Sequence, residues 1–213
     1  MHPGIAYATL AYIAWGLFPL YFQLFKAVSP LEIIAHRTLW SLVFLAGVLL
    51  WRRQLAWLRP LVRQPRVLGV FALSALLLAG NWLVYVWAVT NGQVLESSLG
   101  YFILPLVSVA LGTLFLHERP RPGQWLAVAI AAAGVAWLTW QTGRLPWAAL
   151  ALAFTFGFYG LLRKTAPLGA LEGLSLETAL LLPLALAYLA WTGNTGQAAW
   201  THAGPGLLAN LLA

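Results

Sequence analysis

The chain is dominated by a succession of apolar stretches, each about as long as a bilayer is thick. A helix needs about 20 mostly apolar residues to cross a membrane. Windows of that length predict seven spans and the start of an eighth near residue 204; the seven run over residues 4–24, 31–51, 67–89, 94–116, 125–141, 146–162 and 171–191. The alternation typical of β-barrel strands is absent. We therefore expect an all-α, polytopic transmembrane helix bundle.

The composition agrees with a chain embedded in lipid. Apolar residues make up 62% of the 213 residues and charged residues 8%, whereas soluble domains carry about 25% charged residues. A water-soluble fold of this size could not cover that much apolar surface. The chain has no Cys, which excludes thiol catalysis, disulfide scaffolds and Cys-based zinc sites.

The distribution of basic residues predicts the orientation in the membrane. Short loops rich in Lys and Arg stay in the cytoplasm. The loops after the second, fourth and sixth spans carry Arg52, Arg53, Arg59, Arg63, Arg66, Arg119, Arg121, Arg163 and Lys164, and the opposite loops carry Lys26 and Arg144. We therefore expect a cytoplasmic N-terminus. The formal net charge of +7 indicates topology, and nucleic acid is not expected as a partner.

A weak internal repeat indicates inverted symmetry. Trp15-Gly16-Leu17-Phe18 recurs as Phe156-Gly157-Phe158-Tyr159, and Leu31-Glu32 recurs as Leu171-Glu172, at an offset of about 140 residues. A repeat of five helices is odd-numbered, so its second copy would enter the membrane upside down, as in many transporters. We expect residues 1–141 to form the first five-helix repeat and residues 142–213 an incomplete second one. The same offset places Arg37 opposite Glu177.

Polar and aromatic residues inside the spans are the candidates for function, because an ionisable group in hydrocarbon is costly. We predict that a solute cavity is lined by Trp15, Arg37, Asn81, Tyr85, Tyr101 and Glu177. His36 and Glu96 are titratable candidates for proton coupling. Arg37 could bind a carboxylate through two parallel hydrogen bonds, which favours an anionic or zwitterionic organic metabolite.

Each of these candidates has a structural alternative. Arg37 could pair internally with Glu177 or Glu96 and lock helices together. The amide of Asn81 could join two helices by hydrogen bonding. Glu96 could be an interfacial acid favoured by the helix dipole, and Glu32 fits an extension to the membrane surface.

Features of enzymes are lacking. The chain contains no Asp, and His2, His36, His117 and His202 are too scattered in the sequence to form a metal site. No glycine-rich phosphate loop is present, so the chain is not expected to hydrolyse ATP. We expect no catalytic activity, no metal and no cofactor. Ser108 and Gly112 form a small-residue face that predicts close helix packing.

Residues 81–140 contain four motifs: ESSLGYFILPL at residues 96–106, LFLHER at 114–119, GQW at 123–125 and AGV at 133–135. Through these motifs the segment resembles the EamA-type half of the drug/metabolite transporter superfamily. Within that family the chain is most similar to the RarD subgroup, through AHRTLWS at 35–41, NWLVYVWAV at 81–89, FGFYGLLRK at 156–164 and GLSLET at 173–178.

This resemblance implies ten helices in two inverted five-helix repeats, a cytoplasmic N-terminus and a location in the bacterial inner membrane. With seven to eight helices, the second repeat here is expected to be truncated, lacking helices 8 to 10. The implied function is that of a secondary transporter, which moves a small organic metabolite or drug-like solute by alternating access. Its expected partners are that solute, the bilayer and, as a candidate coupling ion, protons; the oligomeric state is left open. The alternative is a non-transporting structural or assembly subunit, or an inactive fragment.

Overall fold

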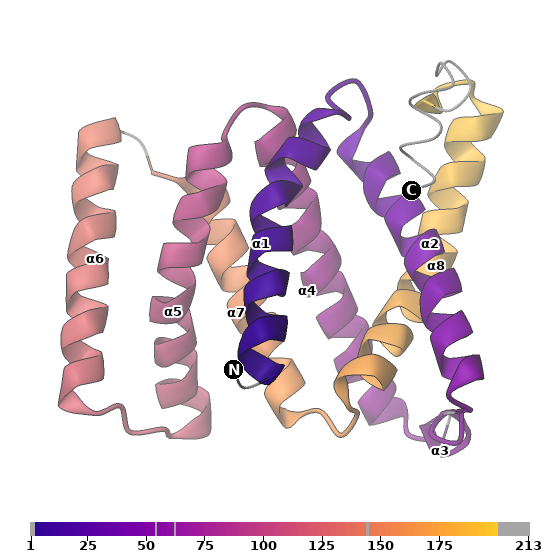
Figure 1. The fold of residues 1–213 in the computed structure, drawn as a ribbon, viewed down its shortest axis with the longest axis horizontal. Coiled ribbons are helices and arrows are strands. Elements are labelled where there is room, and N and C mark those ends of the chain that lie inside the picture. Colours follow the sequence, from indigo (N-terminus) through magenta and orange to yellow (C-terminus); the bar gives the residue numbers. More distant parts are fainter. Residues whose placement is uncertain (1–2, 54, 62, 144, 200–213) are drawn as a thin grey trace.

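The computed structural model describes residues 3–53, 55–61, 63–143 and 145–199. Within them the chain forms helices and no strand (Figure 1), which confirms the all-α prediction. The helices are α1 Pro3–Gln23, α2 Pro30–Trp51, α3 Leu58–Leu61, α4 Pro65–Thr90, α5 Val94–Leu116, α6 Pro122–Thr142, α7 Trp147–Thr165 and α8 Ala170–Asn194. The eighth span predicted near residue 204 lies outside the described residues.

The ends of the long helices follow from local sequence. Pro30, Pro65 and Pro122 begin α2, α4 and α6, positions where the missing N–H of proline costs nothing and its fixed φ fits a helix. The cap that follows α6 is Gly143, with φ 64° in the left-handed region, where glycine has no steric penalty. Each of the seven predicted spans corresponds to one of the long helices of the described residues.

Six described helices are long and apolar enough to cross a membrane, namely α1, α2, α4, α5, α6 and α8. This confirms a multi-pass membrane protein. α7, which we also predicted as a span, forms a helix but is not among the six. Its last turn carries Arg163 and Lys164, which lower its mean hydropathy. It packs against both α4 and α5, so it presents less of its surface to lipid than the helices at the edge.

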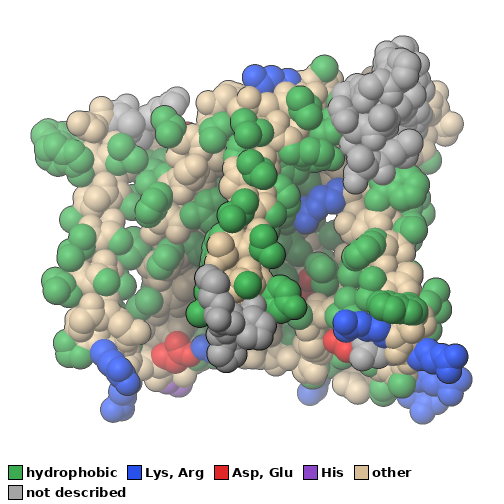
Figure 2. All heavy atoms as spheres, in the orientation of Figure 1, with side chains coloured by type: hydrophobic (Ala, Val, Ile, Leu, Met, Phe, Trp, Pro, Cys, Tyr) green, Lys and Arg blue, Asp and Glu red, His purple; other side chains and the backbone are tan. Residues whose placement is uncertain are grey.

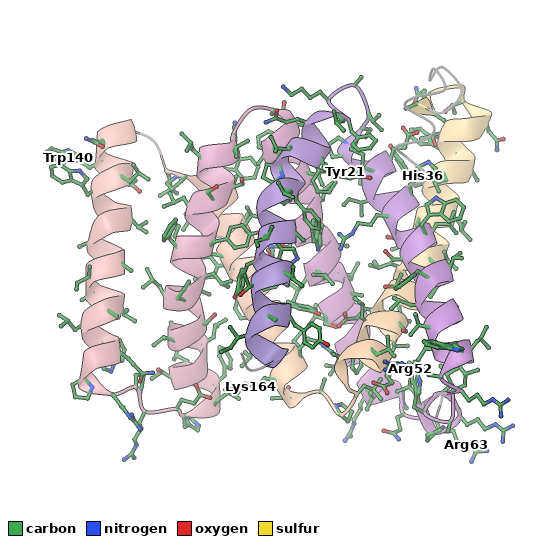
Figure 3. All side chains as sticks on the ribbon, in the orientation of Figure 1. Tyr21, His36, Arg52, Arg63, Trp140 and Lys164 are labelled. Carbon is green, nitrogen blue, oxygen red and sulfur yellow. The ribbon has the colours of Figure 1, made fainter. Side chains whose placement is uncertain are left out.

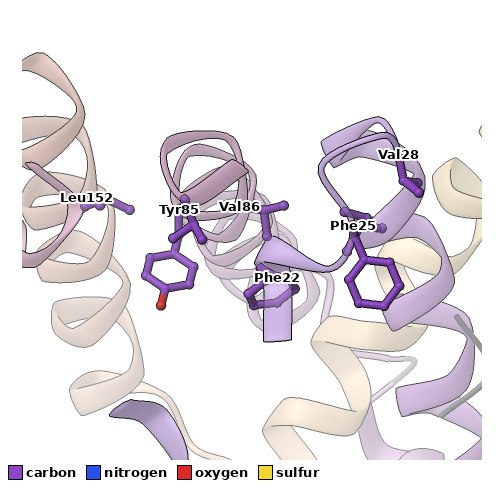
Figure 4. Close-up of a cluster of buried hydrophobic side chains, with 8 residues drawn as sticks. Phe22, Phe25, Val28, Tyr85, Val86 and Leu152 are labelled. Atoms are coloured by element: carbon purple, nitrogen blue, oxygen red, sulfur yellow. The ribbon is translucent and has the colours of Figure 1, made fainter. Parts of the chain in front are cut away.

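The bundle is extended, with α6 at one end and α2 and α8 at the other (Figure 1). α8 packs against α2 and α4, α1 packs against α4, and α6 packs against α5. A buried apolar cluster joins α1 and the turn after it to α4 and α7, and includes Phe22, Phe25, Val86 and Leu152 (Figure 4). The division into repeats at residue 141 falls in the last turn of α6 and stays a prediction.

Two glycines bring α5 and α7 close together. A Cβ at Gly157 would lie 2.7 Å from the Cγ1 of Val107, and one at Gly100 would lie 3.0 Å from the Cβ of Leu152. Small residues at such positions let helix backbones approach and gain van der Waals contact.

The close-packing face predicted at Ser108 and Gly112 is wrong. Ser108 is exposed, and a Cβ at Gly112 would meet the side chain of Glu118, 2.6 Å from its Oε2, rather than another helix. The face of α5 that packs against α7 passes through Gly100 and Val107 instead, which the helical period separates from Ser108.

The basic residues gather where the sequence predicted. Arg52, Arg63 and Lys164 lie at the lower edge of the bundle, the same side on which α1 begins (Figures 1 and 3). Arg163 was expected in a loop, but it lies in the last turn of α7. We call this side the basic face.

Candidate functional site

A cavity of about 420 Å³ lies between α1, α2 and α4. In Figure 2 the surface is hollowed between α1 and α2, and a basic side chain is visible in the hollow. The polar lining comes from His36, Arg37 and Ser41 of α2. The aromatic lining consists of Phe18, Tyr21, Phe22, Phe25, Trp40, Phe44 and Trp82. This volume and this mixture of aromatic walls with a few polar groups are typical of sites for small organic molecules.

Arg37 is the charged group of this cavity. Its guanidinium carbon lies 3.6 Å from the centre of the Trp82 ring, a cation–π contact that offsets part of the cost of holding a charge among apolar groups. In the described part of the chain Arg37 forms no ion pair, so its predicted pairing with Glu177 or Glu96 is not observed. The guanidinium keeps N–H donors with which it can bind an anionic group of a solute.

A smaller cavity of about 90 Å³ adjoins the same residue. Arg37, Ser41 and Trp82 line both cavities. The far wall of the smaller one is formed by α8, through Leu174, Thr178 and Leu181. Arg37 therefore lies between the solute-sized cavity and the helix that carries Glu177.

Asn81 and Tyr85 lie next to Trp82 but face other helices. The side-chain amide of Asn81 donates to the backbone oxygen of Leu152 and to Oγ1 of Thr155, both at 2.9 Å. It thereby joins α4 to α7, as in the structural alternative considered above. Tyr85 belongs to the buried apolar cluster and meets the Trp82 ring edge-on at 5.6 Å.

The remaining predicted residues are dispersed. Glu96 accepts the backbone N–H of Ala148 at 3.0 Å, so it satisfies one of the free donors at the start of α7. Trp15 on α1 and Tyr101 on α5 are 53% and 59% exposed and lie outside the lining of both cavities. Of the eight predicted site residues, the larger cavity brings together His36 and Arg37. The roles of the others stay predictions.

Glu177 is buried, with 1% of its side chain exposed, at the junction of α4, α7 and α8. It accepts a hydrogen bond of 2.6 Å from Ser74 Oγ and one of 3.4 Å from the hydroxyl of Tyr159. Its ion pair is with Arg163, whose Nε lies 3.8 Å away. The structural alternative that pairs Arg37 with Glu177 is therefore not observed, because the ion-pair partner of Glu177 is Arg163.

Glu32 does not extend its side chain outward, as its structural alternative had it. It is 2% exposed, and its Oε1 accepts the backbone N–H of Ala199 at 2.8 Å. The segment that follows α8 covers the first turn of α2, as the full burial of Ala198 shows. Such a contact between residues 167 positions apart has no local signal in the sequence.

The aromatic lining from α1 and the turn after it was not among the predicted residues. Phe18 and Phe22 are four residues apart, which places them on one side of α1, and Phe25 lies in the turn that follows. Trp82 was part of the NWLVYVWAV motif at residues 81–89 but was not among the predicted lining residues. The helical spacing of the aromatic residues was the signal that could have identified this wall.

Comparison with known proteins identifies a family and several relatives of this chain. Residues 2–140 match the EamA-like transporter family. An uncharacterized transporter of Pseudomonas aeruginosa is 53% identical over 92% of this chain and 67% of its own length. Protein RarD of Streptomyces exfoliatus is 46% identical over 95% of this chain and 64% of its length. The uncharacterized transporter YojE of Bacillus subtilis is 46% identical over 96% of this chain and 70% of its length.

No solved structure matches the chain. The chain spans about two thirds of the length of the curated relatives that it matches. The family match covers more than half of the chain, and the relatives match nearly all of it. The chain belongs to the EamA-like transporter family, with RarD proteins among its relatives.

Proposed function

We propose that the protein is a secondary transporter of the bacterial inner membrane, with its N-terminus in the cytoplasm, and that it moves a small organic solute by alternating access. One observation carries this proposal: the Arg37 guanidinium, stacked on Trp82, lies in an aromatic-lined cavity of about 420 Å³. The basic face, on which α1 also begins, supports the orientation. The names of the relatives, several of them transporters, support the general activity.

The solute that fits this cavity carries a carboxylate and an aromatic ring. A carboxylate can accept two parallel hydrogen bonds at the edge of the Arg37 guanidinium while the face of the group remains against Trp82. The ring would pack on the Phe18 and Phe22 wall. This chemistry is common to aromatic carboxylic acids and to zwitterionic aromatic metabolites.

Alternating access is supported by the position of the smaller cavity relative to the two predicted repeats. α2 and α8, which the predicted repeat makes equivalent, pack against each other, and the smaller cavity lies between them and α4. In inverted-repeat transporters the site lies at the interface of the repeats, and one repeat rocks against the other. His36, which lines the cavity, and Glu96 remain candidates for proton coupling.

Ligand binding to the purified chain in lipid nanodiscs tests the site. Benzoate, phenylalanine and phenethylamine serve as anionic, zwitterionic and cationic probes, and tryptophan fluorescence reports occupancy near Trp82. We expect benzoate to bind more tightly than phenethylamine. We expect Arg37→Gln to weaken benzoate binding about tenfold or more, because a hydrogen bond to a charged group contributes about 1.5–3 kcal/mol.

Arg121→Gln is the matched control, since it removes the same charge at an exposed position and should leave binding unchanged. Equal binding of the anionic and cationic probes, or unchanged binding in Arg37→Gln, would contradict the proposed site. Uptake of labelled benzoate into sealed vesicles then separates a transporter from a non-transporting subunit or an inactive fragment, which would bind the probe without flux.

A further inference from the structure

A second polar cluster lies away from the solute cavity, where α4, α7 and α8 meet. Its centre is the Glu177 carboxylate, which contacts Ser74 of α4 and both Tyr159 and Arg163 of α7. We call these four residues the Glu177 cluster. The partners of the carboxylate all come from other helices, so the state of this one group affects how three helices are held together.

The guanidinium of Arg163 occupies a shaped space beside α8. Its Nη2 donates to the backbone oxygen of Gly169 at 3.0 Å, and its carbon lies 5.2 Å from the centre of the Phe71 ring. A Cβ at Gly173 would overlap the guanidinium, so this glycine makes room for it. The side chain is 16% exposed and belongs to the last turn of α7, at the basic face.

The charge balance of the cluster depends on a proton. With Glu177 ionised, the pair is neutral overall and the carboxylate has hydrogen-bond donors on both oxygens. When Glu177 binds a proton, the partly buried Arg163 keeps its charge but loses the carboxylate that balances it, and breaking one side of a buried pair is unfavourable. The guanidinium lies close to the end of its helix, so it can regain hydration by moving outward to water at the basic face.

The cluster is linked to the solute site by neighbouring residues. Thr178, which follows Glu177, lines the smaller cavity, and so does Leu78, one helical turn after Ser74. Arg37 of α2 lies on the opposite wall of that cavity and also lines the larger one. A displacement of α8 against α4 would therefore change the wall that Arg37 shares.

We propose that Glu177, in place of His36 or Glu96, is the proton-binding group of this transporter, and that its protonation releases Arg163 and loosens α7 and α8 at the basic face. The charged and titratable groups around it are Arg163 and Tyr159 from α7 and, across the smaller cavity, Arg37 from α2; α4 supplies the hydroxyl of Ser74. This inference rests on the proposed transport function and names its coupling site.

Infrared difference spectroscopy of the chain in lipid bilayers, recorded as the pH is stepped, tests the proposal without any solute. We expect a carbonyl band of a protonated carboxylic acid that grows as the pH falls. Glu177→Gln should remove the component of this band that belongs to Glu177, while the other four Glu residues keep theirs. Glu118→Gln, which removes an exposed carboxylate paired with Lys164, should leave the Glu177 component in place.

Gly173→Ala provides a second variant in which every titratable group is retained. Its methyl group displaces Arg163, so the acid band should appear at a higher pH than in the original chain. The proposal would be overturned if the difference spectrum of Glu177→Gln equals that of the original chain. It would also be overturned if the Glu177 component appears at the same pH in Gly173→Ala as in the original chain. If Glu177→Gln does not fold, the Gly173→Ala result alone decides.

The two proposals fail in different ways. Benzoate binding that depends on Arg37, together with no band assigned to Glu177, removes the coupling site and keeps the solute site. A Glu177 band without any probe binding does the opposite. In sealed vesicles, Glu177→Gln should retain exchange of labelled benzoate and lose accumulation driven by a pH gradient. If the variant still accumulates benzoate under a pH gradient, the coupling role is refuted.

Discussion

Asn81 offers a measurable test of whether a buried amide in this bundle serves packing or solute binding. Its amide donates to the Leu152 backbone oxygen and to Thr155 Oγ1, each at 2.9 Å. Both acceptors lie on α7, so the two bonds fasten α4 to that helix. We therefore predict that Asn81→Leu lowers the stability of the bundle and leaves the affinity for the benzoate probe unchanged.

The magnitude follows from what such bonds contribute in membranes. Hydrogen bonds between transmembrane helices average about 0.6 kcal/mol, because the separated helices also find partners. Two bonds predict a loss of about 1.2 kcal/mol for Asn81→Leu. Thr155→Val removes one of the two acceptors and should cost about half as much through this interaction. The double variant should then be more stable than the sum of the two losses predicts, by about 0.6 kcal/mol.

Reversible unfolding in mixed micelles gives the free energies for this double-mutant cycle. Thr113→Val is the matched control for Thr155→Val, because the hydroxyl of Thr113 bonds the backbone oxygen of Val109 in its own helix at 2.8 Å. The Asn81 and Thr113 changes should be additive. The packing role would be refuted if the effects of Asn81→Leu and Thr155→Val add within about 0.3 kcal/mol. It would also be refuted if Asn81→Leu keeps its full stability but binds the benzoate probe more weakly.

Three further predictions concern packing, surface charge and backbone strain. Gly157→Ala should lower the free energy of unfolding by about 1–3 kcal/mol, because the added methyl group overpacks against α5. At Gly160 a Cβ meets nothing within 4 Å, so Gly160→Ala should leave the free energy of unfolding unchanged or raise it by up to about 1 kcal/mol. Thermal unfolding measures both variants. Glu118→Gln breaks the exposed pair with Lys164 and should change stability by less than about 1 kcal/mol, an effect that high salt removes. His117 has φ 53° at the end of α5, so His117→Val should destabilise the protein by about 1–2 kcal/mol relative to His117→Gly, as denaturant titration would show.

The spans and the place of Arg37 in a cavity could be predicted from the sequence, because both follow from the cost of putting polar groups in lipid. A segment that crosses lipid must be apolar over its whole length, and a charge placed deep within it is expensive. Neither inference requires knowledge of which helices are neighbours. The structure confirms the helices and places Arg37 in the lining of both cavities.

The partners of the buried charges could not be predicted, because they are set by tertiary contacts. Ser74 and Glu177 are 103 positions apart, and Glu177 pairs with Arg163 rather than with Arg37. The internal repeat related Arg37 to Glu177, but equivalent positions in two repeats need not touch.

The orientation of aromatic residues is also poorly encoded in a membrane chain. Lipid tails are as apolar as a protein core, so hydrophobicity does not distinguish a side chain that faces lipid from one that faces another helix. Trp15 and Tyr101 are exposed on the described bundle, whereas Phe22 and Trp82 line the cavity. All four are aromatic residues within apolar segments, so hydrophobicity alone does not separate the two that line the cavity from the two that are exposed.

The two ends of α8 are held by different chemistry, and this difference gives the proposed coupling a direction. Away from the basic face, Ala199 N–H donates to Glu32 and the Tyr188 hydroxyl lies 3.4 Å from Ser29 Oγ. A backbone N–H can still donate to a protonated carboxylic acid, so this end changes little when a proton binds. At the basic face Glu177 meets a fixed positive charge, and a proton removes that attraction. Proton binding therefore favours opening at the cytoplasmic side of the proposed orientation, while the contacts at the opposite end of α8 remain closed.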